Sequence, residues 1–597
     1  MFSRLTPIGR LTVTAVIIGL LFGGFKLLQS KGFLNAKEGQ ESVTLNKIDL
    51  PDAPKNAASS VPALGLPSSK PAKLSSPEVR WLMWAWNAQM GALLANGGAQ
   101  TTEGSIMAAK NVNLRITRQD DVSQMQGNLV KFAQDYKANP ASATTGCHFV
   151  TIMGDGAAAF LAGVNPQLEK LGKDYRAQIV YTCGRSLGED KFMGPAAWKQ
   201  NPQTAKGGVC AAVLRDGDWN IVIKWCGDNG IPVNADETTY DADAMNFVAA
   251  DTYLNASEKY INGYTEDREE IKAGKKTGKK VKVPVNSVTT WTPGDVMVAQ
   301  KKGGLVSIVS TREYRSQMPC VLIGIKKWME DNRPTVENMI SGIAEGGDQV
   351  KSYSPALKKA ADISAAVYNE ETGEYWEKYY NGIVETDKQG LQVELGGSRV
   401  NNLADNLEMF GINAGSANVC SIVYTTFGDI VKRLYPTLVP SYPSADDVFN
   451  LSFLKNVAAK TGGKMATADE TKFNGDDNIR QAVSKKSWSI EFESGKSTFT
   501  PSTMATLNKL FNDLVIANTL KVEINGHTDN VGDFNQNMQL SERRAFAIKQ
   551  WLEKKSPTNF PEGRLAIKAH GSANPLMPND SPEGKAKNRR VEIVMGN

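Results

Sequence analysis

Histidine is scarce in this sequence, with only three copies, His148, His527 and His570, in 597 residues. The sequence also lacks HExxH and CxxC segments. These absences disfavour a histidine-based zinc centre, a zinc ribbon and a thioredoxin-type site, because each needs closely spaced nitrogen or sulfur ligands. We therefore predict that the chain holds no metal.

Signatures of nucleotide binding and of catalysis are missing as well. The sequence contains no GxGxxG and no GxxxxGK[ST], which hold phosphates, and no GxSxG or paired catalytic carboxylates at a recognisable spacing. We predict no catalytic residue, no cofactor, and a protein that is not an enzyme. An enzyme without a recognisable motif is kept as a third alternative.

The formal net charge of +5 is small for a chain of 597 residues, and no basic stripe is interleaved with aromatic side chains. A nucleic-acid partner is therefore not expected. The densest basic stretch, KKTGKKVK at 275–282, is predicted to be a solvated loop, since runs of charge usually face water.

Cysteine is confined to the middle of the chain, where six copies lie between residues 147 and 420. An even number in an exported protein permits disulfides, but six thiols allow fifteen pairings. Residue spacing does not choose among these pairings, so the disulfide pattern stays open.

The N-terminal apolar run is short. Residues 11–25 carry no charge and lie between Arg10 and Lys26, whereas a membrane-spanning helix needs about 20 apolar residues. The long side chains of Arg10 and Lys26 can reach the bilayer interfaces, and no A-x-A cleavage site or lipobox cysteine follows. We predict a signal anchor at 1–32 in the inner membrane, with the N-terminus in the cytoplasm and the domains in the periplasm. Export after signal cleavage is the alternative.

Residues 33–78 show no hydrophobic periodicity and are rich in proline, serine and alanine. Such a composition buries too little apolar surface to offset the entropy of the chain. We predict a linker that gives the folded parts reach from the membrane.

The C-terminal segment, 484–597, has a regular periodicity. Alternating patterns predict strands at 488–492, 520–525, 564–570 and 590–594, and helical spacing predicts helices at 501–517 and 540–552. This order of elements predicts an α+β domain with helices packed on a sheet.

Three sequence blocks in this segment carry a family resemblance. They are NGHTDN at 525–530, NMQLSERRA at 537–545 and NRRVEI at 588–593. In this order and spacing they resemble the OmpA-like domain of outer-membrane protein A, of peptidoglycan-associated lipoprotein and of the flagellar stator. The resemblance implies a domain that binds peptidoglycan non-covalently in a Gram-negative type of cell envelope.

The same resemblance assigns binding residues. It implies that Asp529 and Arg544 hold the diaminopimelate of the peptidoglycan stem peptide, with Thr528 and Asn537 as hydrogen-bonding helpers. A zwitterionic amino-acid end needs a carboxylate for its ammonium and a guanidinium for its carboxylate, and this pair supplies both. Arg589 is expected to be structural and to support the site.

The middle segment, 79–472, alternates strand-like and helical patterns, which predicts an α/β domain. Strand candidates lie at 112–116, 148–153, 178–181, 210–214, 288–291 and 305–309. Short landmarks resemble the periplasmic solute-binding proteins of the nitrate, taurine and alkanesulfonate group; they are WAWNAQMGA at 84–92, RITRQDD at 115–121, VTTWTPGD at 288–295, STREY at 310–314 and KKW at 326–328. The resemblance implies an ABC transporter substrate-binding fold with two α/β lobes, lobe two at about 182–287, that close on a small solute.

Candidate solute-binding residues follow from this resemblance and from two loops. GDG at 154–156 follows an apolar strand and opens a helix, so its amides could receive an anion, whereas Asp155 would repel the anion or cap the helix itself. In the loop 183–190, Arg185 could pair with an anionic ligand or with an acidic neighbour. The candidates are Trp86, Asn87, Gly154, Asp155, Gly156, Arg185, Ser186, Thr290 and Trp291, although aromatic residues more often belong to the core.

Together these patterns predict a non-enzymatic envelope protein with a membrane anchor, a linker, a solute-binding-like module for ligand sensing or partner binding, and a domain that binds the cell wall. The expected partners are peptidoglycan, a small solute of anionic character, the inner membrane and a membrane protein. The alternative is a structural or stator-like tether from membrane to cell wall without a solute site. Coupling to ion flow is disfavoured because residues 11–28 contain no acidic residue.

Overall fold

The computed structural model describes residues 63–461, 472–473, 478–493 and 495–597. The predicted anchor at 1–32 and the first part of the predicted linker lie outside these ranges. Among the described residues, no helix is both long and apolar enough to cross a membrane. The last part of the predicted linker pairs with the following segment, because the amides of Ser68 and Ala72 donate to the carbonyls of Glu103 and Thr101.

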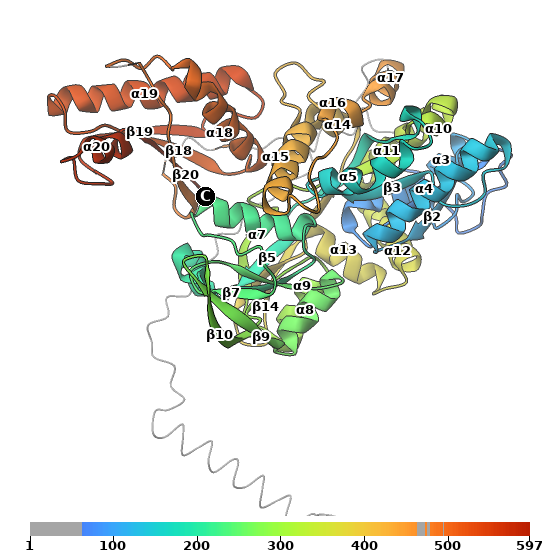
Figure 1. The fold of residues 1–597 in the computed structure, drawn as a ribbon. Coiled ribbons are helices and arrows are strands. Elements are labelled where there is room, and N and C mark those ends of the chain that lie inside the picture. The colour runs from blue at the N-terminus through green and yellow to red at the C-terminus, as the bar shows by residue number, and fades with distance from the viewer. Residues whose placement is uncertain (1–62, 462–471, 474–477, 494) are drawn as a thin grey trace, which may run out of the picture. The chain divides into compact units, whose positions relative to one another are not determined.

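The middle of the chain, residues 78–460, contains two larger sheets, and we call it the two-sheet module (Figure 1). Its first sheet has the order β16-β4-β13-β3-β1-β2, with β1, β2, β3 and β4 parallel and β13 and β16 antiparallel to them. The carboxyl ends of β1, β3 and β4 therefore share one edge. The strands are β1 Glu78–Met83, β2 Asn113–Arg118, β3 Phe149–Met153, β4 Ala177–Ser186, β13 Pro319–Ile325 and β16 Ser398–Val400.

Helices cover this first sheet, since β3 and β4 are buried along their whole length. Helices α2 and α11 approach each other at glycines: a Cβ on Gly346 would lie 2.1 Å from the carbonyl oxygen of Gly91, so a side chain there would separate the helices. The helices are α2 Met90–Asn96, α3 Ile106–Ala109, α4 Val122–Ala138, α5 Ala157–Leu168, α10 Lys326–Asp331, α11 Arg333–Ser352, α12 Ser354–Tyr368, α13 Gly373–Asn381, α14 Leu403–Met409, α15 Val419–Leu434, α16 Ala445–Val448 and α17 Ser452–Lys460.

The second sheet has the order β12-β5-β11-β6-β8, with β6, β8 and β11 parallel and β5 antiparallel to both of its neighbours. The chain enters this sheet after β4 and leaves it after β12, so residues 187–190 and 311–318 form the two connections between the sheets. Its elements span 191–310, a wider range than the predicted lobe at 182–287. They are β5 Lys191–Gly194, α6 Ala196–Gln200, β6 Val209–Ala212, α7 Gly217–Asp228, β8 Asn246–Ala249, α8 Tyr253–Ile261, β11 Ser287–Thr290, α9 Gly294–Met297 and β12 Val306–Ser310.

The strand predictions for the middle segment are confirmed, because the six candidates coincide with β2, β3, β4, β6, β11 and β12. Two loop predictions are wrong. Residues 275–282 belong to β10 Lys275–Pro284, which pairs with β9 Thr265–Lys272, because Val283 is buried while the lysines face water. Residues 183–186 extend β4, where they pair with β13 and β16.

Two small strand groups complete the two-sheet module. Strand β7 Thr239–Asp241 pairs with β9, and β14 Ile383–Thr386 forms a hairpin with β15 Gln392–Leu395. The six cysteines are all buried and unpaired, so the structure contains none of the fifteen disulfide patterns that their number permits; they are Cys147, Cys183, Cys210, Cys226, Cys320 and Cys420.

The C-terminal domain is a four-stranded sheet of order β17-β20-β18-β19, on which α19 packs across β18 and β19 (Figure 1). The predicted α+β class is confirmed. Its elements are β17 Ala482–Trp488, α18 Met504–Ile516, β18 Lys521–His527, α19 Phe534–Lys555, β19 Leu565–Gly571, α20 Pro582–Asn588 and β20 Val591–Gly596. The first strand ends where its prediction began, because β17 is largely polar and its pattern does not stand out.

The C-terminal domain contacts the two-sheet module through buried polar groups. In α7, the Lys224 ammonium lies 3.1 Å from the carboxylate of Asp228 and 3.5 Å from that of Asp513 in α18. The amide of Ser316, in the second connection between the sheets, donates to the carbonyl of Ile516 at 3.1 Å. The domain therefore rests on both α7 and this connection.

Candidate functional site

A groove at one side of the C-terminal sheet collects charged residues from three elements. Arg544 lies in α19, Asp529 in the loop after β18, and Arg589 directly after α20. They come together because β18 lies between β20 and β19, under α19. The groove has a volume of about 380 Å³ and is lined by Ser489, Ile490, Glu491, Phe492, Gly526, His527, Arg544, Ala586, Lys587, Arg589, Arg590 and Val591.

Asp529 stands beside this groove and is held by two donors. A terminal nitrogen of Arg589 donates to one carboxylate oxygen at 2.6 Å, and the amide of Val531 donates to the other at 3.1 Å. The Asp529 side chain is 12% exposed, whereas that of Arg589 is 47% exposed. Arg589 is thus the mobile partner of a carboxylate that the loop holds in place.

Thr528 and Asn537 fix the loop that carries Asp529. The amide of Thr528 donates to the carbonyl of Gly571 at 2.8 Å, and its hydroxyl donates to the carbonyl of Asp529 at 2.9 Å. The side-chain amide of Asn537 donates to the carbonyl of Val531 at 3.1 Å. Both predicted helpers therefore position the carboxylate through backbone contacts.

Arg544 is anchored while its charge stays at the groove. Its Nε donates to the carbonyl of Lys496 at 3.1 Å, and its guanidinium lies 4.9 Å from the centre of the Phe492 ring. Burial lowers the pKa of Arg544, and the positive charge of Arg589 lowers it further, whereas Asp529 raises it. The groove lining carries Arg544, Arg589, Arg590 and Lys587 against Glu491, with Asp529 beside it, so the net charge is positive and suits a ligand carboxylate.

His527, which lines the groove, stacks its imidazole ring on that of His570. The rings of His527 and His570 lie 4.7 Å apart at an interplanar angle of 7°. Burial, together with the positive charge of Arg590, lowers the pKa of His527 to about 4, so this ring is neutral near neutral pH. His527 therefore adds surface to the groove without adding charge.

The two sheets of the middle module touch at their carboxyl edges. Trp84, after β1, stacks on Trp291, after β11, with ring centres 5.9 Å apart, and Trp291 stacks on Tyr253 at 3.7 Å. The indole nitrogen of Trp291 donates to the carbonyl of Ala85 at 3.4 Å. The structure is therefore closed at this interface.

The other predicted residues at these edges are buried as well. The carbonyl of Trp86 accepts from the hydroxyl of Tyr368 at 3.0 Å. Within the described part of the chain, neither the indole nitrogen of Trp86 nor the side-chain amide of Asn87 has a hydrogen-bond partner. The hydroxyl of Thr290, at the end of β11, lies 3.0 Å from that of Ser257 in α8. Thr290 therefore contacts a helix that belongs to its own sheet.

The loop at 154–156 follows β3 and precedes α5, as predicted. The amides of Gly154 and Gly156 donate to backbone carbonyls, at 2.8 and 3.1 Å, and are therefore not free to receive an anion. The N-cap of α5 is Gly156, without a side-chain cap, so Asp155 does not cap this helix. Its carboxylate accepts instead from the amide of Gln317 at 2.9 Å.

Asp155 belongs to a cluster of carboxyl groups that sequence reasoning missed, with Asp190 in the first connection and Asp216 and Asp218 at the start of α7. Asp155, Asp190 and Asp218 are buried, and Asp216 is half-buried. Burial raises the pKa of Asp190 and Asp216 to about 6. Burial first, and neighbouring carboxyls second, raise the pKa of Asp218 well above its usual range, and Asp155 shows the same direction. The available signal was DGD at 216–218, which forms the N-cap and first residues of α7, as GDG at 154–156 leads into α5.

This cluster predicts an unusual dependence of stability on pH. A carboxyl with a raised pKa keeps its proton in the folded chain. Its contribution to folding stability is therefore full below 3.8, the pKa of aspartate in the unfolded chain, and is lost as the pH rises through the pKa of the folded chain. We expect Asp218→Asn to raise the thermal midpoint at about pH 7.5 and much less at about pH 5. The advantage of the amide should shrink by about 1.4 kcal/mol per pH unit.

Thermal unfolding of the ligand-free chain at both pH values measures this effect. The matched control is Asp251→Asn, since Asp251 lies in the same part of the module and is exposed. Equal shifts for Asp218→Asn at both pH values would show that its carboxyl has an ordinary pKa in the folded chain.

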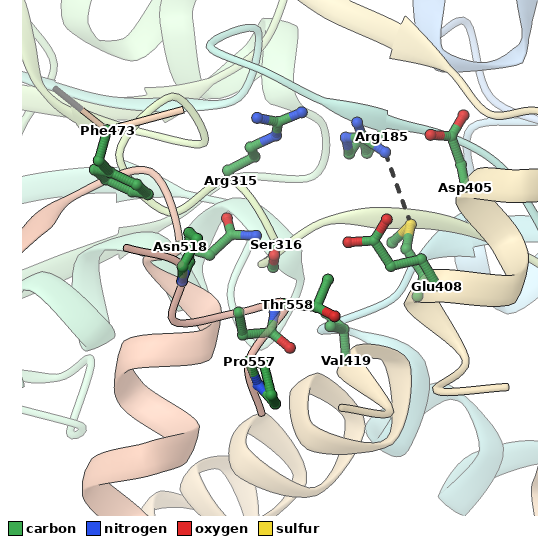
Figure 2. A pocket seen from close by; sticks show the side chains of 13 residues that line it. Arg185, Arg315, Ser316, Asp405, Glu408, Val419, Phe473, Asn518, Pro557 and Thr558 are labelled. Atoms are coloured by element: carbon green, nitrogen blue, oxygen red, sulfur yellow. Dashed lines mark hydrogen bonds between the residues drawn. The ribbon is translucent and has the colours of Figure 1, made fainter. Parts of the chain in front are cut away.

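Arg185 lies away from this cluster. It is 5% exposed, and a terminal nitrogen donates to the side-chain oxygen of Asn401 at 2.9 Å and lies 3.9 Å from the sulfur of Met409 (Figure 2). The Ser186 hydroxyl lies 2.6 Å from that of Thr311, which ties together the starts of the two connections.

Figure 2 shows that Arg185 points into a pocket shared with the C-terminal domain. The pocket has a volume of about 390 Å³ and holds two arginines and two acidic residues. Its lining residues are Arg185, Arg315, Ser316, Asp405, Glu408, Met409, Val419, Phe473, Asn518, Pro557, Thr558, Asn559 and Pro561. The structure therefore separates Arg185 from Asn87, Asp155 and Trp291, with which the sequence grouped it.

Comparison with curated proteins finds relatives over short stretches of this chain. Over 112 residues the chain is 37% identical to the photosystem I P700 chlorophyll a apoprotein A2 of Gloeobacter violaceus, and over 106 residues 36% identical to the peptidoglycan-binding protein ArfA of Mycobacterium tuberculosis. Each match covers 18% of this chain, and the matches cover 12% and 32% of those relatives, so the chain spans a third or less of their length. A solved structure, the cell wall anchor of the T6SS from Pseudomonas aeruginosa, is 25% identical over 20% of this chain and 86% of that chain, with a TM-score of 0.17.

The fold and the groove define the C-terminal part as a helix-on-sheet domain with a charged groove. Residues 491–589 match the family model described as the OmpA family. The C-terminal domain of this chain is therefore an OmpA family domain.

Proposed function

We propose that the OmpA family domain binds peptidoglycan non-covalently, with Asp529 and Arg544 as its ligand-binding residues. The observation that carries this proposal is the placement of a fixed carboxylate and a fixed guanidinium at one groove, close enough that Asp529 raises the pKa of Arg544. The relative named peptidoglycan-binding protein ArfA, which matches over this domain, supports it.

The groove suits the zwitterionic end of diaminopimelate. The ligand's ammonium would contact Asp529, and its carboxylate would contact Arg544. Arg589, which is half exposed, would leave Asp529 and join the ligand's carboxylate, so that one ion pair in the free groove becomes two in the complex. In the complex the two guanidiniums share the ligand's carboxylate, so each charged group contacts one of opposite sign.

For the two-sheet module, the proposal is a periplasmic-binding-protein-like pair of lobes that closes on a small solute. Ligands of open α/β sheets bind at the carboxyl ends of the strands, and here two such edges face each other. The role is binding without catalysis, in a cell envelope, with the N-terminal segment in the inner membrane and a membrane protein as partner.

A tether without a solute site is the second candidate. Both candidate functions include peptidoglycan binding by the OmpA family domain. They differ in the role of the two-sheet module, which binds no solute in the tether. The observation in its favour is the close stack of Trp84, Trp291 and Tyr253, whose rings fill part of the interface between the sheets.

Co-sedimentation of the full chain with purified sacculi tests peptidoglycan binding. We expect the chain to sediment with sacculi and to be released by the stem peptide that contains meso-diaminopimelate. The control is the same peptide with L-lysine, whose side chain ends in an ammonium without a carboxylate and leaves Arg544 without a counterion. Equal release by both peptides, or no sedimentation, would refute the assignment.

A further inference from the structure

We propose that the two-sheet module takes a positively charged solute, an organic ammonium ion, between its sheets. The binding groups form what we call the inter-sheet site: Asp155, Asp190, Asp218, Asn220 and Gln317. This inference rests on the proposed solute-binding function of the module and reverses the anionic character that the sequence led us to expect.

The inter-sheet site consists of hydrogen-bond acceptors. Among the described residues, the side-chain oxygens of Asn220 and Gln317 and one carboxylate oxygen of Asp155 find no donor. The carboxyl groups of Asp190 and Asp218 contact each other, and Asp190 also contacts Ser186, so most of their acceptor sites are left over. All five residues are at least 98% buried. Because a buried acceptor without a donor costs about 1–3 kcal/mol, such a concentration indicates that a donor-rich ligand belongs there.

The two amides in the site are oriented by their own hydrogen bonds. The side-chain nitrogen of Gln317 donates to the carboxylate of Asp155 at 2.9 Å, and that of Asn220 donates to the backbone carbonyl of Asp155 at 3.2 Å. Turning either amide over would place oxygen against oxygen. The oxygens of Gln317 and Asn220 are therefore left for the ligand.

The charges around the site favour a cation. Asp155, Asp190 and Asp218 act electrostatically on one another, and Asp216 acts on both Asp155 and Asp218. The nearby ammonium of Lys191 is paired with Asp295, and both side chains are fully buried. Glu189, next to Asp190, accepts from the hydroxyl of Ser398. An ammonium ion would stabilise the ionised form of these carboxyls, which burial disfavours in the ligand-free chain, whereas an anion would disfavour that form further.

An organic cation fits better than a bare metal ion. Within the described ranges, no three histidine, cysteine, aspartate or glutamate side chains are arranged to hold a metal. The same carboxyl edge of the first sheet presents Trp84 and Trp86, whose indole nitrogens have no hydrogen-bond partner among the described residues, and the side chain of Asn87. Aromatic faces attract organic ammonium ions, and these unpartnered groups could meet the polar atoms of the solute's body.

The site is divided between the lobes and their connections. Asp155 comes from the first sheet and Asp218 from the second, while Asp190 and Gln317 lie in the two connections. A solute held by all four would keep the sheets closed, and its entry requires the connections to move.

The test uses the full chain in two measurements. First, the purified protein is denatured and its supernatant analysed by mass spectrometry for a retained small molecule. Second, thermal unfolding is followed with butylammonium, choline and spermidine chlorides, and with sodium butanoate and butanesulfonate as size-matched anions. We expect a retained cation, or a rise of about 5 °C or more with an ammonium probe at saturation, and no rise with the anions.

Variants separate the inter-sheet site from other surfaces. Asp155→Asn and Asp218→Asn should each remove the ammonium effect, whereas the exposed Asp251→Asn should keep it. Stabilisation by calcium or magnesium chloride that depends on the same aspartates would show that the site takes a metal ion and not an organic ammonium ion. A retained anion, or stabilisation by the anionic probes, would overturn the cationic class while the solute-binding function stands. If no compound is retained and no ammonium probe stabilises the chain, both the cationic class and the solute-binding function of the module are refuted. The proposal of peptidoglycan binding is not affected by that result.

Discussion

Arg544→Ala is expected to abolish retention of the chain on sacculi. The variant removes a guanidinium that the carbonyl of Lys496 and the ring of Phe492 hold at the groove, and leaves a ligand carboxylate without its main counterion. A charge-assisted hydrogen bond contributes about 1.5–3 kcal/mol, which corresponds to a loss of affinity of about tenfold to a hundredfold. The fraction of protein that sediments over a series of sacculus concentrations measures this loss.

Arg543→Ala is the matched control, because Arg543 is the neighbouring residue of α19, carries the same charge and is exposed. Asp529→Ala should lose binding as well, since it removes the partner of the ligand's ammonium and frees Arg589. Arg544→Ala that sediments as well as Arg543→Ala would show that the groove is not the binding site.

Arg564→Met is expected to unfold the OmpA family domain. Arg564 is 1% exposed, and its guanidinium donates to the carbonyls of Leu514, Ala517, Leu520 and Asn559 at 2.5–3.2 Å. Methionine keeps much of the volume but removes the guanidinium donor from all four carbonyls. The carbonyl of Ala517 keeps the amide of Leu520 as a donor, and the loss at each of the others costs about 1–3 kcal/mol. We expect a loss of at least 3–5 kcal/mol, a large share of the stability of a typical domain.

Urea unfolding of the full chain, followed through the C-terminal domain by proteolysis, measures this loss. Arg543→Met is the control for the change of residue type at an exposed position. A stable Arg564→Met variant would mean that the four carbonyls find other donors. The comparison also separates two causes of lost wall binding, because Arg544→Ala should stay folded and Arg564→Met should not.

Periodicity predicted the elements that are amphipathic and missed those that are not. The pattern of α18 stands out because its apolar residues fall on one face, and Leu507, Leu510 and Leu514 are fully buried. Strand β17 has the sequence AVSKKSW and lies at the sheet edge, so neither hydrophobicity nor alternation marks its beginning. The hairpin of β9 and β10 was missed for the same reason.

The two candidate sites differ in how far sequence could find them. Asp529 and Arg544 lie 15 positions apart within conserved-looking blocks whose spacing carries a family resemblance, so they could be named in advance. The inter-sheet site draws Asp155, Asp190, Asp218 and Gln317 from four places in the chain. No local pattern connects residues whose proximity depends on the closure of two sheets.

The sequence by itself determined the local elements of this protein. It showed which segments alternate between apolar and polar residues, which form amphipathic helices, and which blocks mark the C-terminal domain. Local periodicity carries that information because the partition of apolar side chains from water acts over a few neighbouring residues. The tertiary structure alone decided that the amides of Gly154 and Gly156 are occupied, that Arg185 lies in another pocket, and that carboxyls gather between the sheets. Burial and charge at a point in space depend on every element that meets there, and only the folded chain brings those elements together.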